Sequence, residues 1–194
     1  TNSLCMVVRK QEHFPKTKKQ LSSVFNIPLA TGTIKNMVTR CAESLKDTYE
    51  QIRLKMITLG LIHCDETGSR VDGKTCWVHV ASDQDYTYLT INQKRGQAGM
   101  DAANVLPHAN GIIMHDCWSS YWKYQNVTHA ICCAHLLREL NGVIENHPEQ
   151  TWAVRFKKLL LDMKKVRDKA LLSDKDEVSY YHRHRFDVEY MLFN

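Results

Sequence analysis

The chain has 194 residues, 43% of them hydrophobic and 24% charged, which is the composition of an ordinary globular protein. Lys and Arg outnumber Asp and Glu by 26 to 21, a mild excess that favours an acidic partner without requiring one. Seven scattered cysteines argue against a secreted disulfide framework and favour reduced thiols in the cytoplasm. The longest apolar runs are far too short to span a bilayer, and no signal peptide is visible.

The first part of the chain predicts helices. Residues 1–20 are basic and poorly patterned, which fits either a solvated lead-in or the remnant of a domain. A short helix at 21–27 and a turn precede a long helix at 33–60, whose apolar residues recur at helical spacing. This outline fits a helix-turn-helix, and the alternative is a helical hairpin packed on a sheet. In a helix-turn-helix, the polar face of the second helix would present Lys35, Asn36, Thr39 and Arg40.

The middle of the chain is rich in β-branched and aromatic residues and predicts a mixed α/β fold. Three strands in a meander are expected at 61–70, 75–82 and 85–92. They are followed by a short helix at 98–106, a buried parallel strand at 111–116 and a fifth strand at 128–133. An Asp-Gly turn at 72–73 makes the first two strands an antiparallel hairpin. Amphipathic helices then fill the remainder, at 135–147, at 151–172 and beyond 179. We expect three parts: a helical segment at 1–58, a catalytic core at 59–135 and a helical region at 136–194.

Two acids each follow an apolar run, and this placement suggests a metal site. Asp65 and Asp116 are expected at the carboxyl ends of strands, where open α/β sheets place their sites. Carboxylate oxygens suit Mg²⁺ or Mn²⁺. The simpler alternative is that both acids only stabilise turns. Glu66 adjoins Asp65, but strand alternation directs it to the other face of the sheet, so we do not include it.

Other polar residues are weaker candidates. Cys132, Cys133 and His135 resemble zinc ligands, but no second pair completes a four-ligand set, so a packed Cys-His cluster is favoured. Basic side chains that can contact phosphate are Lys94, Arg95, Lys123 and Arg138, although surface cations are common in any protein.

Four segments together resemble the IS66-type insertion-sequence transposases of bacteria. They are CDET at 64–67, QKRGQAGMDAANVLP at 93–107, HDCWSSY at 115–121 and HAICCAHLLREL at 129–140. The resemblance implies a DDE enzyme with a ribonuclease H-like core, in which Asp65 and Asp116 are the first two acids. Cys132 and His135 resemble the C-x-x-H signature that this group places after the second acid.

The resemblance also implies a third acid, a glutamate within an N-N-x-x-E-R motif, and no such motif occurs in these residues. We therefore expect an inactive fragment of a transposase that uses Mg²⁺ or Mn²⁺ to cleave DNA at the ends of the element. That transposase would join those ends to target DNA, as a homo-oligomer in the bacterial cytoplasm at the nucleoid. The alternatives are a ribonuclease H-like nuclease and a non-catalytic DNA-binding remnant of a decayed element.

Overall fold

The computed structural model describes residues 13–71, 73–173 and 177–193. The chain forms two compact units that divide between Ala130 and Ile131. The sequence predicted three parts, with boundaries after residues 58 and 135. That division differs from the two units and stays a prediction. Among the described helices, none is long and apolar enough to cross a membrane.

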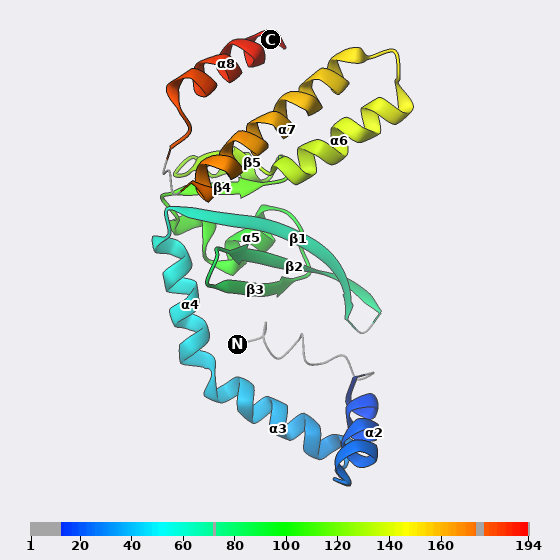
Figure 1. Cartoon of the computed structure of the whole chain (residues 1–194). Helices are drawn as coiled ribbons and strands as arrows, with labels where there is room; N and C mark the ends of the chain where they lie inside the picture. Colours follow the sequence, from blue (N-terminus) through cyan, green and yellow to red (C-terminus); the bar gives the residue numbers. More distant parts are fainter. Residues whose placement is uncertain (1–12, 72, 174–176, 194) are drawn as a thin grey trace. The chain divides into compact units, whose positions relative to one another are not determined.

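The first unit is built on a five-stranded sheet with the order β3-β2-β1-β4-β5 (Figure 1). The strands are β1 (Leu61–Val71), β2 (Lys74–Ser82), β3 (Thr87–Asn92), β4 (Ile112–His115) and β5 (Thr128–Ile131). Strand β2 runs antiparallel to both β1 and β3, whereas β4 runs parallel to β1. The predicted meander, hairpin and parallel strand are thus confirmed, and the fold is the predicted mixed sheet of a ribonuclease H-like core. Asp72 of the hairpin turn lies outside the described residues.

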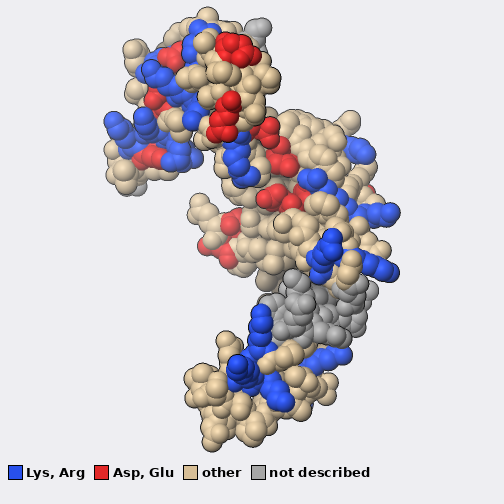
Figure 2. Space-filling model, turned by 90° about the vertical axis from the view of Figure 1, so that its right-hand side faces the viewer, with Lys and Arg blue, Asp and Glu red and all other residues tan. Residues whose placement is uncertain are grey.

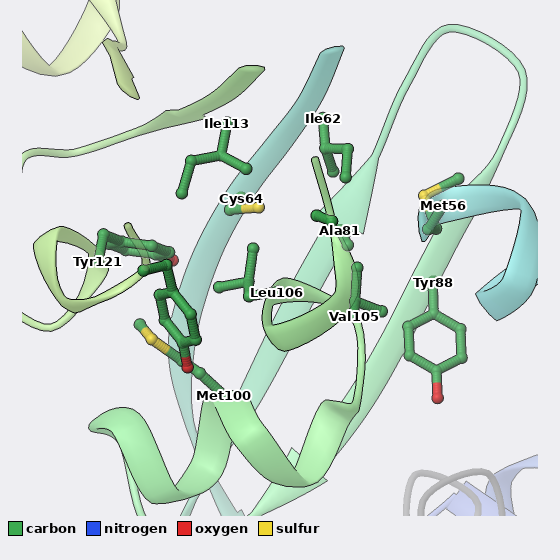
Figure 3. Packing of buried hydrophobic residues seen from close by; sticks show 12 residues of the cluster. Met56, Ile62, Cys64, Ala81, Tyr88, Met100, Val105, Leu106, Ile113 and Tyr121 are labelled. Atoms are coloured by element: carbon green, nitrogen blue, oxygen red, sulfur yellow. The ribbon is translucent and has the colours of Figure 1, made fainter. Parts of the chain in front are cut away.

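Strand β1 forms because its side chains alternate between a buried and an open face. Ile62, Cys64 and Glu66 are buried, whereas His63 and Asp65 between them are exposed. The buried face meets α5 (Gln97–Ala103) and the turn η1 (Leu106–His108), and their apolar side chains fill the core (Figure 3).

Helix α5 approaches the sheet closely because residue 99 is a glycine. A Cβ atom at Gly99 would lie 2.0 Å from the carbonyl oxygen of Lys94 and 2.6 Å from Nε2 of His79. Any larger side chain must therefore push α5 away from the sheet. The imidazole of His79 is hydrogen-bonded to the same carbonyl group, with its Nε2 3.1 Å from the carbonyl oxygen of Lys94.

The N-terminal helices differ from the prediction in two places. A helix, α2 (His13–Phe25), already begins within the stretch expected to be a lead-in. The long helix expected at 33–60 is two helices, α3 (Thr31–Ser44) and α4 (Lys46–Thr58), which meet at Leu45. There the Ser44 hydroxyl donates to the carbonyl of Cys41 at 2.8 Å, a local bond of the kind that bends helices.

The apolar stripe of the expected long helix is therefore only partly buried, with its most buried residues near its two ends. Met56 of α4 is fully buried in the core, and Ile34 of α3 is also buried. Between these two positions, Met37 and Leu45 are 48% and 43% exposed.

The second unit is helical, as predicted. It contains α6 (Cys133–Asn146), α7 (Thr151–Leu172) and α8 (Tyr180–Met191). Helix α7 has the bounds that the sequence predicted, because Pro148 precedes it and its apolar residues recur at helical spacing. Contacts within this unit join α6 to α7 and α7 to α8.

Candidate active site

The two candidate acids belong to neighbouring segments: Asp65 lies within β1, and Asp116 directly follows His115, the last residue of the parallel strand β4. Strands β1 and β4 pair with Ile62 beside Ile113 and His63 beside Met114. If this pairing is continued by two residues beyond His63 and Met114, Asp65 lies beside Asp116. Adjacent strands of a sheet are about 4.8 Å apart. That register would bring together two carboxylates that are 51 positions apart in the chain. Asp65 lies within β1 rather than at its end, because the hairpin carries β1 on to Val71.

Neither acid is neutralised by a cation in the described part of the chain. Oδ1 of Asp65 accepts the backbone N–H of Glu66 at 2.9 Å, and Oδ1 of Asp116 accepts that of Trp118 at 3.0 Å. Asp65 is exposed and Asp116 is half-buried. Each acid is thus oriented through its Oδ1 atom, and no described residue donates a hydrogen bond to its Oδ2 atom.

This pair fits a divalent cation with hard oxygen preferences. Mg²⁺ is commonly held by one or two carboxylates and keeps several waters. Asp65, which is exposed, and Asp116, which is half-buried, provide such carboxylates. The described residues hold no group of three or more His, Cys, Asp and Glu side chains placed to bind a metal, so the pair is an incomplete ligand set.

Glu66, on the other face of β1, is the centre of a buried network. Its side chain is completely buried. Oε1 accepts hydrogen bonds from both Nε and Nη2 of Arg95 at 3.0 Å. Oε2 accepts the hydroxyl of Tyr121 at 2.6 Å. Burial, followed by the bond to Glu66, raises the pKa of Tyr121, so this hydroxyl keeps its proton.

The guanidinium of Arg95 lies against two tryptophan rings. Its carbon is 4.1 Å from the ring centroid of Trp118 and 4.8 Å from that of Trp77. Stacking on aromatic faces and pairing with a carboxylate are the two contacts for which a guanidinium is best suited. Trp77 and Trp118 are thus partners of the Arg95–Glu66 ion pair, and Trp118 also packs against the apolar core.

Two histidines stabilise the turn that follows β4. Nδ1 of His115 accepts the N–H of Cys117 at 3.1 Å, so the neutral ring of His115 carries its proton on Nε2. This Nε2 lies 3.0 Å from Nδ1 of His129 and donates to it. Nε2 of His129 lies 3.0 Å from the carbonyl oxygen of Tyr124, which can only accept. Burial, and then the neighbouring His129, lower the pKa of His115, which favours this neutral form.

The other predicted residues are divided between the two units. Lys94 and Lys123 are exposed on the first unit. Arg138 is exposed on α6 of the second unit. Cys132 precedes α6, where its carbonyl accepts the N–H of His135 at 3.0 Å, and Nδ1 of His135 is buried without a partner among the described residues.

Sequence reasoning placed Glu66 on the correct face but missed its role. A signal was present, because Glu66 continues the inward series of Ile62 and Cys64. A carboxylate at a buried strand position needs a cation or several donors. Which donors it finds depends on the fold, since Arg95 and Tyr121 are 29 and 55 positions away.

A sequence profile of the family "Transposase IS66 family" matches residues 3–191. The chain therefore belongs to the IS66 family of transposases, and the resemblance carried by its sequence segments is confirmed. A comparison with curated proteins found no match.

Solved structures with a similar arrangement include retroviral integrases. The dimeric form of the HTLV-2 integrase catalytic core domain in complex with magnesium is 14% identical, covers 46% of this chain and 74% of its own, and has a TM-score of 0.32. The trimeric form is 13% identical, covers 45% and 73%, and has a TM-score of 0.32. A simian T-cell lymphotropic virus intasome in complex with PP2A regulatory subunit B56 gamma is 13% identical, covers 45% and 42%, and has a TM-score of 0.31. These likenesses are too distant to assign residues.

Proposed function

We propose that Asp65 and Asp116 are two of the metal-binding carboxylates with which an IS66 transposase cleaves DNA strands and joins them to a target. The observation that supports this proposal is the parallel register of β1 and β4, which, if continued by two residues beyond its last pair, would set the two acids side by side. Membership of a transposase family supports DNA as the substrate.

The role of the chain in this reaction is to hold and orient. Divalent ions bound between two carboxylates supply a stronger oxygen nucleophile and stabilise charge on the phosphate. The backbone N–H groups of Glu66 and Trp118 fix one oxygen of each acid, which leaves the other directed toward a ligand. Positioning of this kind is a large part of catalysis in phosphoryl transfer.

A basic surface on α2 and α3 supports a DNA partner. Residues 13–42 contain five Lys and Arg residues and no Asp or Glu. The face of these helices visible in Figure 2 shows cations with no acid among them. The cations of this surface are all exposed: Lys16, Lys18, Lys19, Lys35 and Arg40. We propose that it contacts the phosphates of DNA, together with Lys94, Lys123 and Arg138.

The 194 residues contain two of the three acids that the family resemblance implies, because the N-N-x-x-E-R motif is not among them. We propose that this stretch of chain by itself has little or no cleavage activity. The complete enzyme would act on the ends of its element as a homo-oligomer in the bacterial cytoplasm.

The test uses a full-length transposase that includes the third acid. We expect Asp65→Asn and Asp116→Asn each to reduce Mg²⁺-dependent cleavage of a labelled element end to background while DNA binding is retained. Asp85→Asn is the matched control, because Asp85 is an exposed acid in the β2–β3 turn. Cleavage at the wild-type rate by either site variant would disprove the assignment.

The same assay separates the alternative functions. Joining of the cleaved 3′ end to a second duplex identifies a transposase, whereas cleavage without joining identifies a nuclease. DNA binding without cleavage by the wild-type protein identifies a non-catalytic remnant.

A further inference from the structure

We propose that Glu66 is a positioning residue, which fixes the turn carrying Asp116 against the strand carrying Asp65. The inference rests on the proposed function, because the relative position of the two acids matters only if they act together. Glu66 does not face the acid pair and would not touch metal or DNA. It acts through two series of contacts, called arms below. One reaches the residues on either side of Asp116, and the other reaches the Asp116 carboxylate.

The first arm runs through Tyr121 and His115. Tyr121 donates to Glu66 at 2.6 Å, and its ring stacks on His115 with centroids 4.5 Å apart. His115 is completely buried and directly precedes Asp116. Its Nδ1 accepts the N–H of Cys117, the residue that follows Asp116. Glu66 thereby holds the backbone on both sides of the second acid.

The second arm runs through Arg95 and Trp118. Arg95 donates twice to Glu66, and its guanidinium lies 4.1 Å from the ring centroid of Trp118. The backbone N–H of Trp118 in turn donates to Oδ1 of Asp116. This arm therefore ends on the carboxylate itself. It also uses the Arg95 side chain in an internal contact, so we assign Arg95 to positioning rather than to DNA binding.

The turn needs such support because its backbone is unusual. Cys117 has a φ of 73°, in the left-handed region that residues other than glycine rarely adopt. Conformations of this kind persist where the surrounding contacts enforce them. The two arms start in different segments of the chain, at Arg95 and Tyr121, and both bond to Glu66. Within the turn they are joined again, because the backbone N–H of Tyr121 donates to the carbonyl of Trp118 at 3.1 Å. Three of the segments that carry the family resemblance, at 64–67, 93–107 and 115–121, thus converge on one carboxylate.

The experiment measures hydrogen exchange of single amides by NMR, without metal, in the 194-residue chain. Tyr121→Phe removes the hydroxyl of the first arm and keeps the ring. Arg95→Lys keeps the charge of the second arm and removes the planar fork and its stacking. Tyr124→Phe is the matched control, because its hydroxyl also donates to a carboxylate, at 2.7 Å, but to Asp101 on α5.

We expect Tyr121→Phe and Arg95→Lys each to lower the protection of the Cys117 and Trp118 amides about fivefold to tenfold relative to amides of β2. Tyr124→Phe should leave that ratio unchanged. If both arm variants leave the ratio unchanged, or if all amides lose protection equally, Glu66 is only a stabilising residue and the proposal is wrong.

A second measurement separates this proposal from the function on which it rests. Addition of Mg²⁺ to the wild-type chain should shift the amide resonances around Asp65 and Asp116, with an apparent affinity that falls about tenfold in Tyr121→Phe. Absence of any shift in the wild type contradicts the metal site. The exchange ratios measured without metal still decide whether Glu66 positions the turn.

Discussion

Asp65 and Glu66 are neighbouring acids on one strand, and the two faces of the sheet give them opposite environments. Asp65 is exposed, with one backbone N–H as its partner and no described cation nearby. Glu66 is completely buried, and its two oxygens accept three side-chain hydrogen bonds. A carboxylate whose bonds are all internal stabilises the fold, whereas one left open can bind a ligand. Burial and partners, rather than residue type, therefore distinguish the structural acid from the acid that we propose to be functional.

The largest expected effect is the loss of stability when the buried acid is removed. Glu66→Ala should lower the free energy of unfolding by about 2–4 kcal/mol, because it leaves Arg95 and Tyr121 without their partner. The loss lies toward the low end of values for buried ion pairs, since the Arg95 side chain is 38% exposed. Denaturant unfolding of the first unit measures this change.

The matched substitution on the open face is Asp65→Ala, which should change stability by no more than about 0.5 kcal/mol. Equal destabilisation by the two substitutions would remove the distinction between the faces.

A smaller effect is expected where α5 covers the buried face. Gly99→Ala should destabilise the protein by about 1–3 kcal/mol, because its Cβ overlaps the carbonyl of Lys94 and the ring of His79. Gly142→Ala is the control, since Gly142 lies within α6 with open space around its Cβ position. That change should stabilise the second unit by about 0.5–1 kcal/mol. Thermal unfolding of both variants compares the two positions, and a stable Gly99→Ala protein would show that α5 can move away without cost.

The last expected effect is a pH dependence that belongs to the buried face. Burial lowers the pKa of His79 and of His115 below the ordinary value of about 6.5. Both rings are therefore neutral in the folded protein and take up protons more readily when it unfolds. Stability should be constant above about pH 7 and should fall as the pH decreases through 6.5, by up to about 1.4 kcal/mol per pH unit for each proton.

Unfolding at fixed denaturant between pH 5 and 8 measures this slope, and His79→Gln should reduce it. A stability that rises as the pH falls through this range would show that the histidines are stabilised in the charged form instead.

Local pattern predicted most of the fold, and long-range contacts account for what it missed. Alternating apolar residues were sufficient for β1, and helical spacing after Pro148 was sufficient for α7. The break at Leu45 was missed because a continuous apolar stripe gives no sign of a local side-chain bond. The assignment of the two acids to a metal site stays a prediction, because spacing alone does not separate a metal site from turn residues. The network around Glu66 could not be predicted, because its partners come from segments that only the folded sheet brings together.

The most direct test of the central claim is where Mn²⁺ binds on the chain. Paramagnetic broadening of amide resonances detects even weak binding and reports its location. We predict broadening centred on residues 64–66 and 115–118 in the wild type. It should be lost in Asp65→Asn and in Asp116→Asn and retained in Asp85→Asn. Unchanged broadening in either site variant, or broadening centred elsewhere, would contradict the assignment of these two acids as a metal site.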